Sequence, residues 1–311
     1  MAHEKNEQSK SLYVKLPENE YCIDYIIVSN EKVILAKKTD DASKVTPGLA
    51  GTLKTIADFL DALPIVLTDK FSGEKLEESI IYSRHNIPVV NRETFEEIVL
   101  GASFPLIYFT HGGVYVKVKG AKLKELREKM GLSRGELAWR VGVSNKAIAN
   151  YEEGESDVSL DVALKLEEIF GDVIFEEATP ESLKLVFNEK IKAREIEPRD
   201  PIIRSIFNEL RSYGFKNYVF TRVPFDAGVK LTREKMKVKI AIKKEASSGE
   251  VNIASRVSQQ THTPLIVISD KKEEIGDTDE NLIFVRSQDP RSVKEIILRL
   301  LKKEGRKTQN D

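Results

Sequence analysis

The sequence contains little cysteine, methionine or tryptophan, and it has no long apolar run. Cys22 is the single cysteine among 311 residues, so no internal disulfide can form, which fits a reducing compartment. No stretch approaches the roughly 20 apolar residues that cross a bilayer. The polar first 20 residues also lack the apolar core of a signal peptide. We therefore expect a cytoplasmic protein with no membrane partner.

Excess charge of one sign is also missing. The chain has 49 Lys and Arg against 50 Asp and Glu, which gives a formal net charge of −1. This balance excludes a basic coat over the whole protein, so any DNA contact must come from a local patch. The four histidines lack metal-ligand spacing, and no Gly-x-Ser-x-Gly or Cys/His nucleophile pattern occurs. We predict no metal site, no cofactor and no catalytic residue.

The N-terminal part alternates strands and helices after a leader at 1–19, which we expect to be disordered. Thr46 and Asn91 are placed to cap helices, the first of which begins with Pro47. Short apolar runs predict strands at 21–28, 33–36, 65–67 and 87–90. This alternation predicts an α/β domain over 20–104 with a largely parallel sheet.

The C-terminal part, 199–304, repeats this order of elements. Apolar runs predict strands near 217–222, 237–242, 265–268 and 282–285. Ala36-Lys37-Lys38 matches Ile242-Lys243-Lys244, each at the end of a strand. We interpret the two parts as one α/β fold duplicated around a central insert, although two ordinary α/β units could also look alike.

Shorter segments connect these parts. Two apolar runs around Gly112-Gly113 predict a β-hairpin connector at 105–120. A linker is predicted at 181–198, and a tail at 305–311.

The central segment, 121–180, reads as an all-α domain of four or five short helices. Ser133 and Glu136 have the spacing of a capping box at the start of one helix. Gly142 follows where a tight turn needs positive φ, Ser144 can cap the next helix, and Gly154 can end it. Two short helices joined by a tight turn are typical of a DNA-binding helix-turn-helix.

The stretch from Leu132 to Gly154 resembles the Cro and lambda-repressor (XRE-like) type of helix-turn-helix. The Leu137-Ala138 pair, the Gly142-Val143-Ser144 turn, Ile148 and the closing Glu152-x-Gly154 are in register with that family. The resemblance implies a structural ion pair between Arg127 and Glu152. It also implies binding as a symmetric homodimer. Arg134 departs from the family, which usually has Gln there.

We predict a recognition helix at Ser144–Glu152 that enters the major groove of double-stranded DNA. Asn145 can pair with adenine edges, and Lys146 can reach guanine or phosphate. Arg134 begins the preceding helix and is placed to contact phosphate. The full set of predicted DNA-binding residues is Arg134, Ser144, Asn145, Lys146, Ala149 and Asn150.

Local charge supports this interface. Residues 122–150 hold seven Lys/Arg and three Asp/Glu, a balance of +4, whereas 151–172 hold one Lys and eight Asp/Glu, a balance of −7. A basic front and an acidic back would orient the domain on DNA.

The order of elements in both α/β units resembles the restriction-endonuclease-like nucleases. Those enzymes hold Mg²⁺ with an Asp near one strand and a Glu/Asp-x-Lys on the next. Asp24 and Asp226 could be the first acid, but the second acid position is Ala36 before Lys38 and Ile242 before Lys244. We therefore expect degenerate copies that do not cleave DNA.

The whole layout resembles a family of archaeal transcriptional regulators, with Pro88 to Phe95 as a further matching stretch. That resemblance implies a transcriptional regulator. We expect it to be sequence-specific, with α/β parts that serve dimerisation or sensing; no effector can be named. Two alternatives stay open: a metal-dependent, structure-specific nuclease, and a helix-turn-helix module that binds protein.

Overall fold

The structure is a computed structural model. It describes residues 12–17, 20–29, 32–102, 104–110, 112–187, 197–233, 236–244, 246–270, 281–286 and 290–307. The described residues form two compact units. Unit 1 takes its residues from Met1–Lys38, Thr46–Pro64 and Lys190–Asp311, and unit 2 from Thr39–Val45 and Ile65–Glu189. Residues 46–64 thus belong to the same compact unit as the C-terminal residues. The domain boundaries expected from the sequence stay a prediction.

Unit 1 begins with an antiparallel meander of β1 (Leu12–Lys15), β2 (Tyr25–Ser29) and β3 (Lys32–Lys38). The expectation of a disordered leader is wrong for β1. Its pairing with β2 and the burial of Val14 and Leu16 hold this short segment in place. Helix α1 (Pro47–Leu60) follows, and Thr46 Oγ1 accepts a hydrogen bond from Leu49 N at its start, as predicted.

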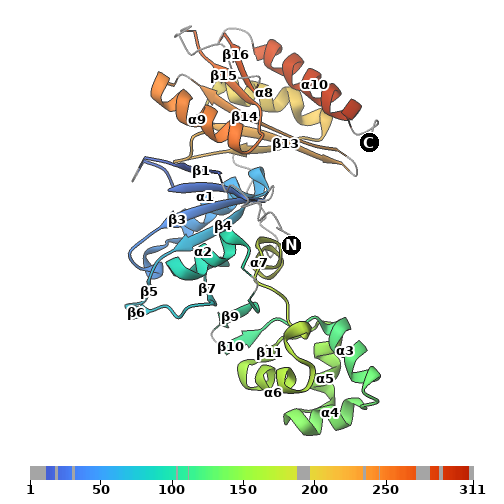
Figure 1. The fold of residues 1–311 in the computed structure, drawn as a ribbon. Helices are drawn as coiled ribbons and strands as arrows, with labels where there is room; N and C mark the ends of the chain where they lie inside the picture. The colour runs from blue at the N-terminus through green and yellow to red at the C-terminus, as the bar shows by residue number, and fades with distance from the viewer. Residues whose placement is uncertain are drawn as a thin grey trace, which may run out of the picture. The chain divides into compact units, whose positions relative to one another are not determined.

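The rest of unit 1 is a five-stranded sheet with helices on both faces (Figure 1). Its strand order is β12 (Lys216–Val219), β13 (Ala227–Arg233), β14 (Met236–Lys244), β15 (Leu265–Ile268) and β16 (Leu282–Val285). The first three strands are antiparallel, and β15 and β16 run parallel to β14. The helices are α8 (Pro201–Leu210), the short η3 (Arg211–Tyr213), α9 (Ser248–Gln260) and α10 (Pro290–Lys307).

Successive residues of β13 face opposite sides of this sheet, and different helices cover the two sides. Ala227 and Val229 pack with apolar residues of α8 and α10 in one core. Gly228 and Lys230 alternate with these residues along the strand, so they lie on the opposite face of the sheet, where α1 and α9 pack. Helix α10 ends at Lys307, so the predicted tail is helical up to that residue.

Unit 1 contains two antiparallel meanders, β1–β3 and β12–β14. Each contains one aspartate, and the two aspartates make the same hydrogen bonds. Asp24 N donates to Ala36 O and Asp226 N to Ile242 O, both at 2.9 Å. Asp24 Oδ1 accepts from Lys37 Nζ at 3.0 Å and Oδ2 from Lys38 N at 2.7 Å. Asp226 accepts from Lys243 Nζ at 3.2 Å and from Lys244 N at 2.7 Å. This atomic match is what a duplicated fold predicts.

Unit 2 is built on a sheet whose strands follow the order β4 (Leu63–Leu67), β8 (Ile87–Val90), β7 (Ile80–Arg84), β9 (Ile107–Thr110), β10 (Gly113–Val116) and β11 (Val158–Ser159). Within unit 2, Val66 and Leu67 of β4 pair in parallel with Val89 and Val90 of β8. The hairpin of β9 and β10 lies within the predicted connector. The two-stranded sheet of β5 (Lys70–Phe71) and β6 (Glu74–Lys75) was not predicted, nor was β7.

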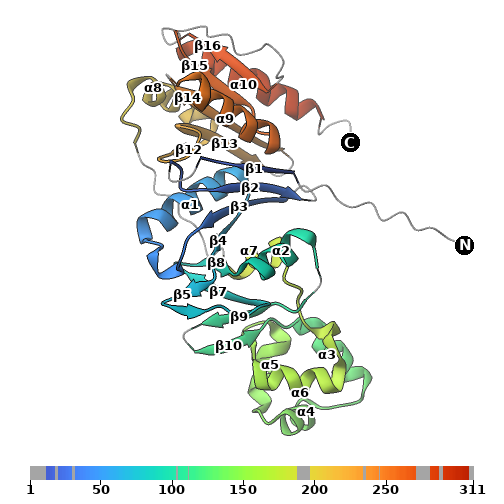
Figure 2. The ribbon, with the colours of Figure 1, turned by 60° about the vertical axis from the view of Figure 1, so that its left-hand side comes forward.

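The helices of unit 2 include the short η1 (Ala42–Lys44) and α2 (Arg92–Leu100), which Asn91 caps as predicted. The central segment then forms α3 (Gly120–Lys129), α4 (Arg134–Val141), α5 (Asn145–Glu153), α6 (Leu160–Phe170) and the short η2 (Asp172–Ile174) (Figure 2). Helix α7 (Pro180–Phe187) occupies part of the predicted linker, and burial of Leu183 and Phe187 explains this correction.

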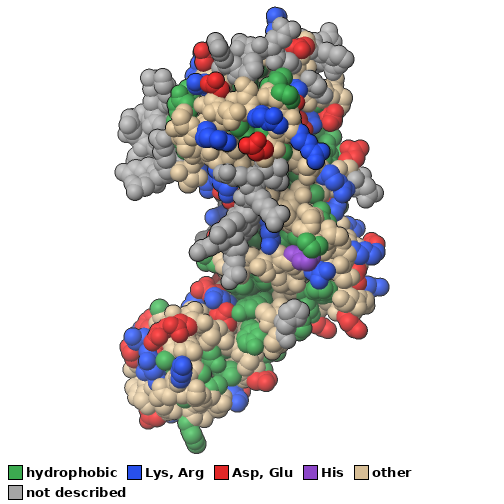
Figure 3. All heavy atoms as spheres, turned by 180° about the vertical axis from the view of Figure 1, so that it is seen from behind, with side chains coloured by type: hydrophobic (Ala, Val, Ile, Leu, Met, Phe, Trp, Pro, Cys, Tyr) green, Lys and Arg blue, Asp and Glu red, His purple; other side chains and the backbone are tan. Residues whose placement is uncertain are grey.

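Two features concern the described part of the chain as a whole. No helix there is long and apolar enough to cross a membrane. In the view of Figure 3, basic and acidic side chains are interspersed, in keeping with the balanced overall charge.

Candidate nucleic-acid interface

Helices α4 and α5 are fixed locally by three caps. Ser133 Oγ accepts from Glu136 N at 3.1 Å, and Glu136 Oε2 accepts from Ser133 N at 2.7 Å, which is a complete capping box. Gly142 takes φ 80° in the turn, a value that a residue with a Cβ rarely adopts. Ser144 Oγ accepts from Ala147 N at 3.1 Å and starts α5. The sequence therefore dictates a helix, a tight turn and a second helix.

The N-terminal tip of α5 is on the surface. Ser144, Asn145 and Lys146 are exposed, whereas Ala149 and Asn150 are half-buried. Ile148, one turn further along α5, is fully buried in the core shared with α3, α4 and α6. A β-carbon at Gly135 of α4 would lie 3.6 Å from Asn145 Nδ2, so the start of α4 adjoins this tip. Three exposed polar side chains thus lie at the N-terminal end of an anchored helix.

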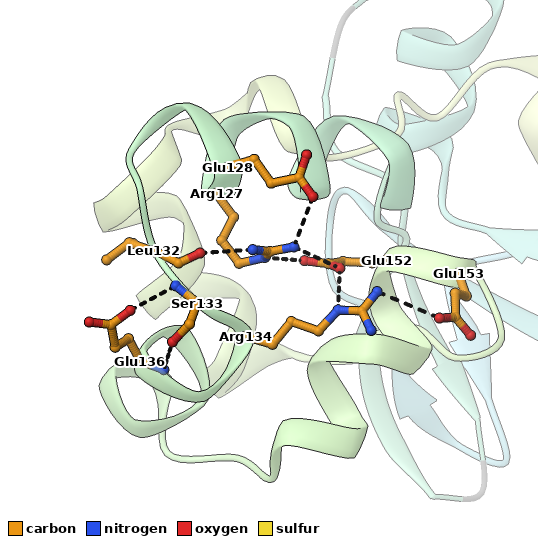
Figure 4. Close-up of polar contacts among 8 residues, drawn as sticks. All are labelled: Arg127, Glu128, Leu132, Ser133, Arg134, Glu136, Glu152 and Glu153. Atoms are coloured by element: carbon orange, nitrogen blue, oxygen red, sulfur yellow. Dashed lines mark hydrogen bonds and ion pairs between the residues drawn. The ribbon is translucent and has the colours of Figure 1, made fainter.

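Glu152, near the end of α5, is held by two arginines (Figure 4). Arg127 of α3 donates through Nε to Glu152 Oε1 and through Nη2 to Oε2 at 3.2 Å. Its Nη1 donates to Leu132 O at 2.8 Å. This is the ion pair that the resemblance implied, and it ties α3 to α5.

The second arginine is Arg134, and sequence reasoning missed this contact. Its Nε donates to Glu152 Oε2 at 2.7 Å, and its Nη2 lies 3.6 Å from Glu153 Oε1. The Arg134 side chain is about one-third exposed, so these contacts do not enclose it fully. A phosphate contact by Arg134 stays a prediction, and it must be compatible with this ion pair. The sequence did contain a signal for this contact: Arg134 stands where the Cro-type family usually has glutamine, and a glutamine could not neutralise the charge of Glu152.

The carboxylate of Glu152 has no exposed surface. Burial by itself would raise the pKa of Glu152, but the hydrogen bonds from Arg127 and Arg134 outweigh it and leave that pKa below its ordinary value. The residue therefore stays charged at neutral pH, and the two arginines hold α5 against both α3 and α4.

Gly120 is a further residue that sequence reasoning missed. A β-carbon there would overlap the backbone carbonyl oxygens of Tyr151 and Glu152. The first residue of α3 must therefore be glycine for α3 to approach the C-terminal end of α5 this closely. No sequence signal marks this need, because the contact joins residues about 30 positions apart.

The hairpin of β9 and β10 is joined to the helical segment by pairing and by one acid. Strand β10 pairs with β11, which precedes α6. Asp157 accepts from Tyr108 Oη at 2.6 Å and lies 3.1 Å from Lys117 Nζ. Burial, followed by the hydrogen bond to Asp157, raises the pKa of Tyr108. The predicted connector therefore packs against the helical segment and supports α5 and α6.

Comparison with known proteins agrees with this geometry. The helix-turn-helix family matches residues 123–173, and the PD-(D/E)XK superfamily domain matches residues 4–105. No solved structure matches the chain.

Curated relatives from archaea cover most of the chain. A protein of Thermococcus kodakarensis is 31% identical, over 83% of this chain and 85% of its own length. One from Methanocaldococcus jannaschii is 31% identical over 71% and 68%, and one from Archaeoglobus fulgidus is 29% identical over 88% and 85%. All three are named "putative HTH-type transcriptional regulatory protein".

The PD-(D/E)XK match implies a divalent metal, so we tested whether the residues fit one. Asp24 accepts hydrogen bonds on both carboxylate oxygens, from Lys37 Nζ and from the backbone N–H of Lys38, and the second acid position is the buried Ala36. In the C-terminal copy Asp226 is likewise paired and Ile242 is buried. Within the described residues, no group of three or more His, Cys, Asp or Glu could hold a metal ion. These residues do not fit a metal.

Proposed function

Because the chain belongs to the family of archaeal HTH-type transcriptional regulatory proteins, we propose that it regulates transcription by binding specific sequences in double-stranded DNA. Helix α5 enters the major groove with its N-terminal tip. Asn145 and Lys146 read base edges there, and Ser144, Ala149 and Asn150 complete the contact surface. We also propose that the protein acts in the cytoplasm.

One observation supports this proposal above the others. The tip of α5 is exposed and carries Asn145 and Lys146, while the same helix is anchored by Ile148 and by the two arginines on Glu152. Recognition needs such a combination, because a side chain can discriminate bases only if its helix is held in a fixed orientation.

The test compares single variants on a duplex selected from random sequences by the wild-type protein. Asn145→Ala and Lys146→Ala should each reduce the preference for the selected duplex over a scrambled one by about 1–3 kcal/mol, roughly 5- to 150-fold. Binding is measured by fluorescence anisotropy at two salt concentrations. The matched control is Lys75→Ala, which removes an exposed lysine of β6 and should leave the preference unchanged.

Arg134→Ala should weaken binding to all duplexes to a similar extent. It removes a proposed phosphate contact and one of the two arginines that hold Glu152, and neither effect depends on the base sequence. If none of the three variants changes affinity or preference, the proposed docking of α5 is wrong.

We further propose that two copies bind together as a homodimer. Their recognition helices would then reach half-sites about one helical turn, roughly 34 Å, apart. Inserting five or ten base pairs between the half-sites of a selected operator should in both cases abolish tight binding, because five turn one half-site to the opposite face of the DNA and ten move it about one further helical turn away. Equal affinity for all three spacings would exclude the paired docking.

A metal-dependent, structure-specific nuclease is the second candidate, because the PD-(D/E)XK domain matches residues 4–105. The poor fit to a metal argues against it, and the prediction that the chain is not an enzyme stays a prediction. Incubation with Mg²⁺ or Mn²⁺ and branched or nicked DNA decides between the two. Metal-dependent products that Asp24→Asn and Asp226→Asn abolish would establish the nuclease.

The protein-interaction module is the third candidate. It would be favoured if the protein bound no genomic fragment even at low salt, where DNA contacts by lysine and arginine are strongest.

A further inference from the structure

In unit 1, the helix of the first α/β repeat packs on the sheet of the second. Phe59 of α1 has no exposed surface, and its ring centre lies 5.3 Å from those of Tyr218 and Phe220 and 6.4 Å from that of Phe225. The ring lies directly over Gly228 of β13, where a β-carbon would come within 2.6 Å of it. These contacts join residues about 160 positions apart.

Lysines of the second repeat surround the C-terminal end of α1. Lys216 Nζ lies 2.5 Å from Asp58 Oδ2, and Asp61 Oδ1 lies 2.6 Å from Lys230 Nζ and 2.7 Å from Lys237 Nζ. Lys230 also donates to Asp58 O, and Lys239 to Leu60 O at 3.1 Å. A helix C-terminus carries partial negative charge, so ammonium groups there complement both the carboxylates and the last carbonyls.

The reverse contact is also present: α9 of the second repeat lies beside β1 of the first (Figures 1 and 2). Helices α1 and α9 occupy equivalent places in the two repeats. Thr46 and Ser247 cap them. A residue with positive φ follows each helix, Asp61 at 60° directly after α1 and His262 at 47° two residues after the end of α9. The connecting loops also meet, since Cys22 N donates to Arg222 O at 2.7 Å.

Such a reciprocal exchange is the arrangement that a two-fold interface has between identical subunits, where each partner offers the same patch to the other. Its centre is apolar and closely packed, with Phe59, Tyr218 and Phe225 all at most 2% exposed. Centres of this kind characterise permanent interfaces rather than transient ones.

We propose that the two α/β repeats form a permanent internal pair, which takes the place that a second chain would have in an α/β homodimer. Each chain then carries one helix-turn-helix for one paired α/β body. The surfaces of α1, α9, β1, β12 and β13 that form this pair are not available to another copy. A homodimer on DNA must therefore form through other surfaces. This inference does not depend on DNA binding.

The test uses zero-length cross-linking of the unmodified full-length chain. Equal amounts of ¹⁴N- and ¹⁵N-labelled protein are unfolded together, refolded, treated with a water-soluble carbodiimide, digested and analysed by mass spectrometry. The reagent joins a carboxylate to an amine in direct contact. We expect cross-links Asp58–Lys216 and Asp61–Lys237, with each cross-linked peptide all-¹⁴N or all-¹⁵N. In the control variant Lys216→Gln the first cross-link should disappear and the second remain.

Two results would overturn the proposal. Mixed ¹⁴N/¹⁵N peptides making up about half of either cross-link would show that the repeats pair between chains. Absence of both cross-links, while the exposed pair of Lys44 and Asp40 is cross-linked, would show that the repeats do not pair at all. Because no DNA is present, either result leaves the proposed function of α5 untouched.

Discussion

The helical segment of unit 2 and the paired repeats of unit 1 are held together in contrasting ways. In the helical segment the defining contacts are local: caps at Ser133 and Ser144, a glycine turn, and a glutamate 25 residues from its main arginine. In unit 1 the defining contacts join lysines to carboxylates and backbone carbonyls of α1 and the residue after it, 158 to 179 positions apart. Local contacts leave a sequence pattern, and distant ones leave almost none.

The same contrast applies to charge. Glu152 is a buried carboxylate with two arginine partners in a single small core, so its loss affects one interface strongly. Around α1 the charge is spread over several lysines, some of them half-exposed, so each contributes little. Four variants test how the helical segment and unit 1 differ in charge and in close packing. They follow from the largest expected effect to the smallest.

Glu152→Ala should have the largest effect. It leaves Arg127, whose side chain is 8% exposed, as a buried cation without its main carboxylate partner, which typically costs about 3–5 kcal/mol. Hydrogen exchange measured by mass spectrometry should show faster exchange across α3 to α6 and unchanged exchange in β13 and β14. The control is Glu153→Ala, which removes an exposed carboxylate. Equal loss of protection in both units would contradict the local role of Glu152.

Gly120→Ala tests close approach in the helical segment. The new methyl group would overlap two backbone carbonyl oxygens, which can give way only if α3 moves off α5, so we expect a loss of about 2–3 kcal/mol. Gly51→Ala is the matched control. It lies within α1 with no atom within 4 Å of the added carbon, and it should stabilise the chain by about 0.5–1 kcal/mol. Stability is measured by urea unfolding, and a neutral Gly120→Ala would disprove the packing argument.

Gly228→Ala tests close approach in unit 1. Its methyl group meets the ring of Phe59, a side chain that can shift, so a smaller loss of about 1–2 kcal/mol is expected. Cys22 reports on this unit, because burial raises the pKa of its thiol to about 12 and keeps it unreactive in the native state. A thiol reagent should label Gly228→Ala roughly 5- to 30-fold faster than wild type. If Gly120→Ala accelerates labelling just as much, the two units do not unfold separately.

These glycines also show what could be predicted from the sequence. The helix-turn-helix, its caps and the pair of Arg127 and Glu152 follow from short spacings and from a resemblance confined to one segment. Strand β13 was missed because Lys230 interrupts its apolar pattern, and only the structure shows that this lysine is buried against α1. The second partner of Glu152 and the need for Gly120 depend on how helices approach in space. The duplicated order of elements was visible in the sequence, whereas the exchange of helices between the repeats was not.

The smallest effect is expected at Asp61, and it depends on pH. Burial alone would raise the pKa of Asp61, but hydrogen bonds from Lys230 and Lys237 outweigh it and hold that pKa below its ordinary value. A folded-state pKa below the unfolded one stabilises the protein above about pH 4, and this contribution is lost as the pH falls through the folded value. Asp61→Asn should therefore cost about 0.5–1 kcal/mol at pH 7 and progressively less on acidification.

Asparagine is the matched replacement because it tolerates the left-handed backbone at this position, where φ is 60°. The measurement is the free energy of unfolding between pH 2 and 7, with Asp40→Asn, from an exposed pair with Lys44, as the control. A constant difference between wild type and Asp61→Asn over this range would show that the carboxylate does not stabilise the end of α1 through its charge. The lysines of β13 and β14 would then hold the repeats together through the backbone carbonyls of α1 alone.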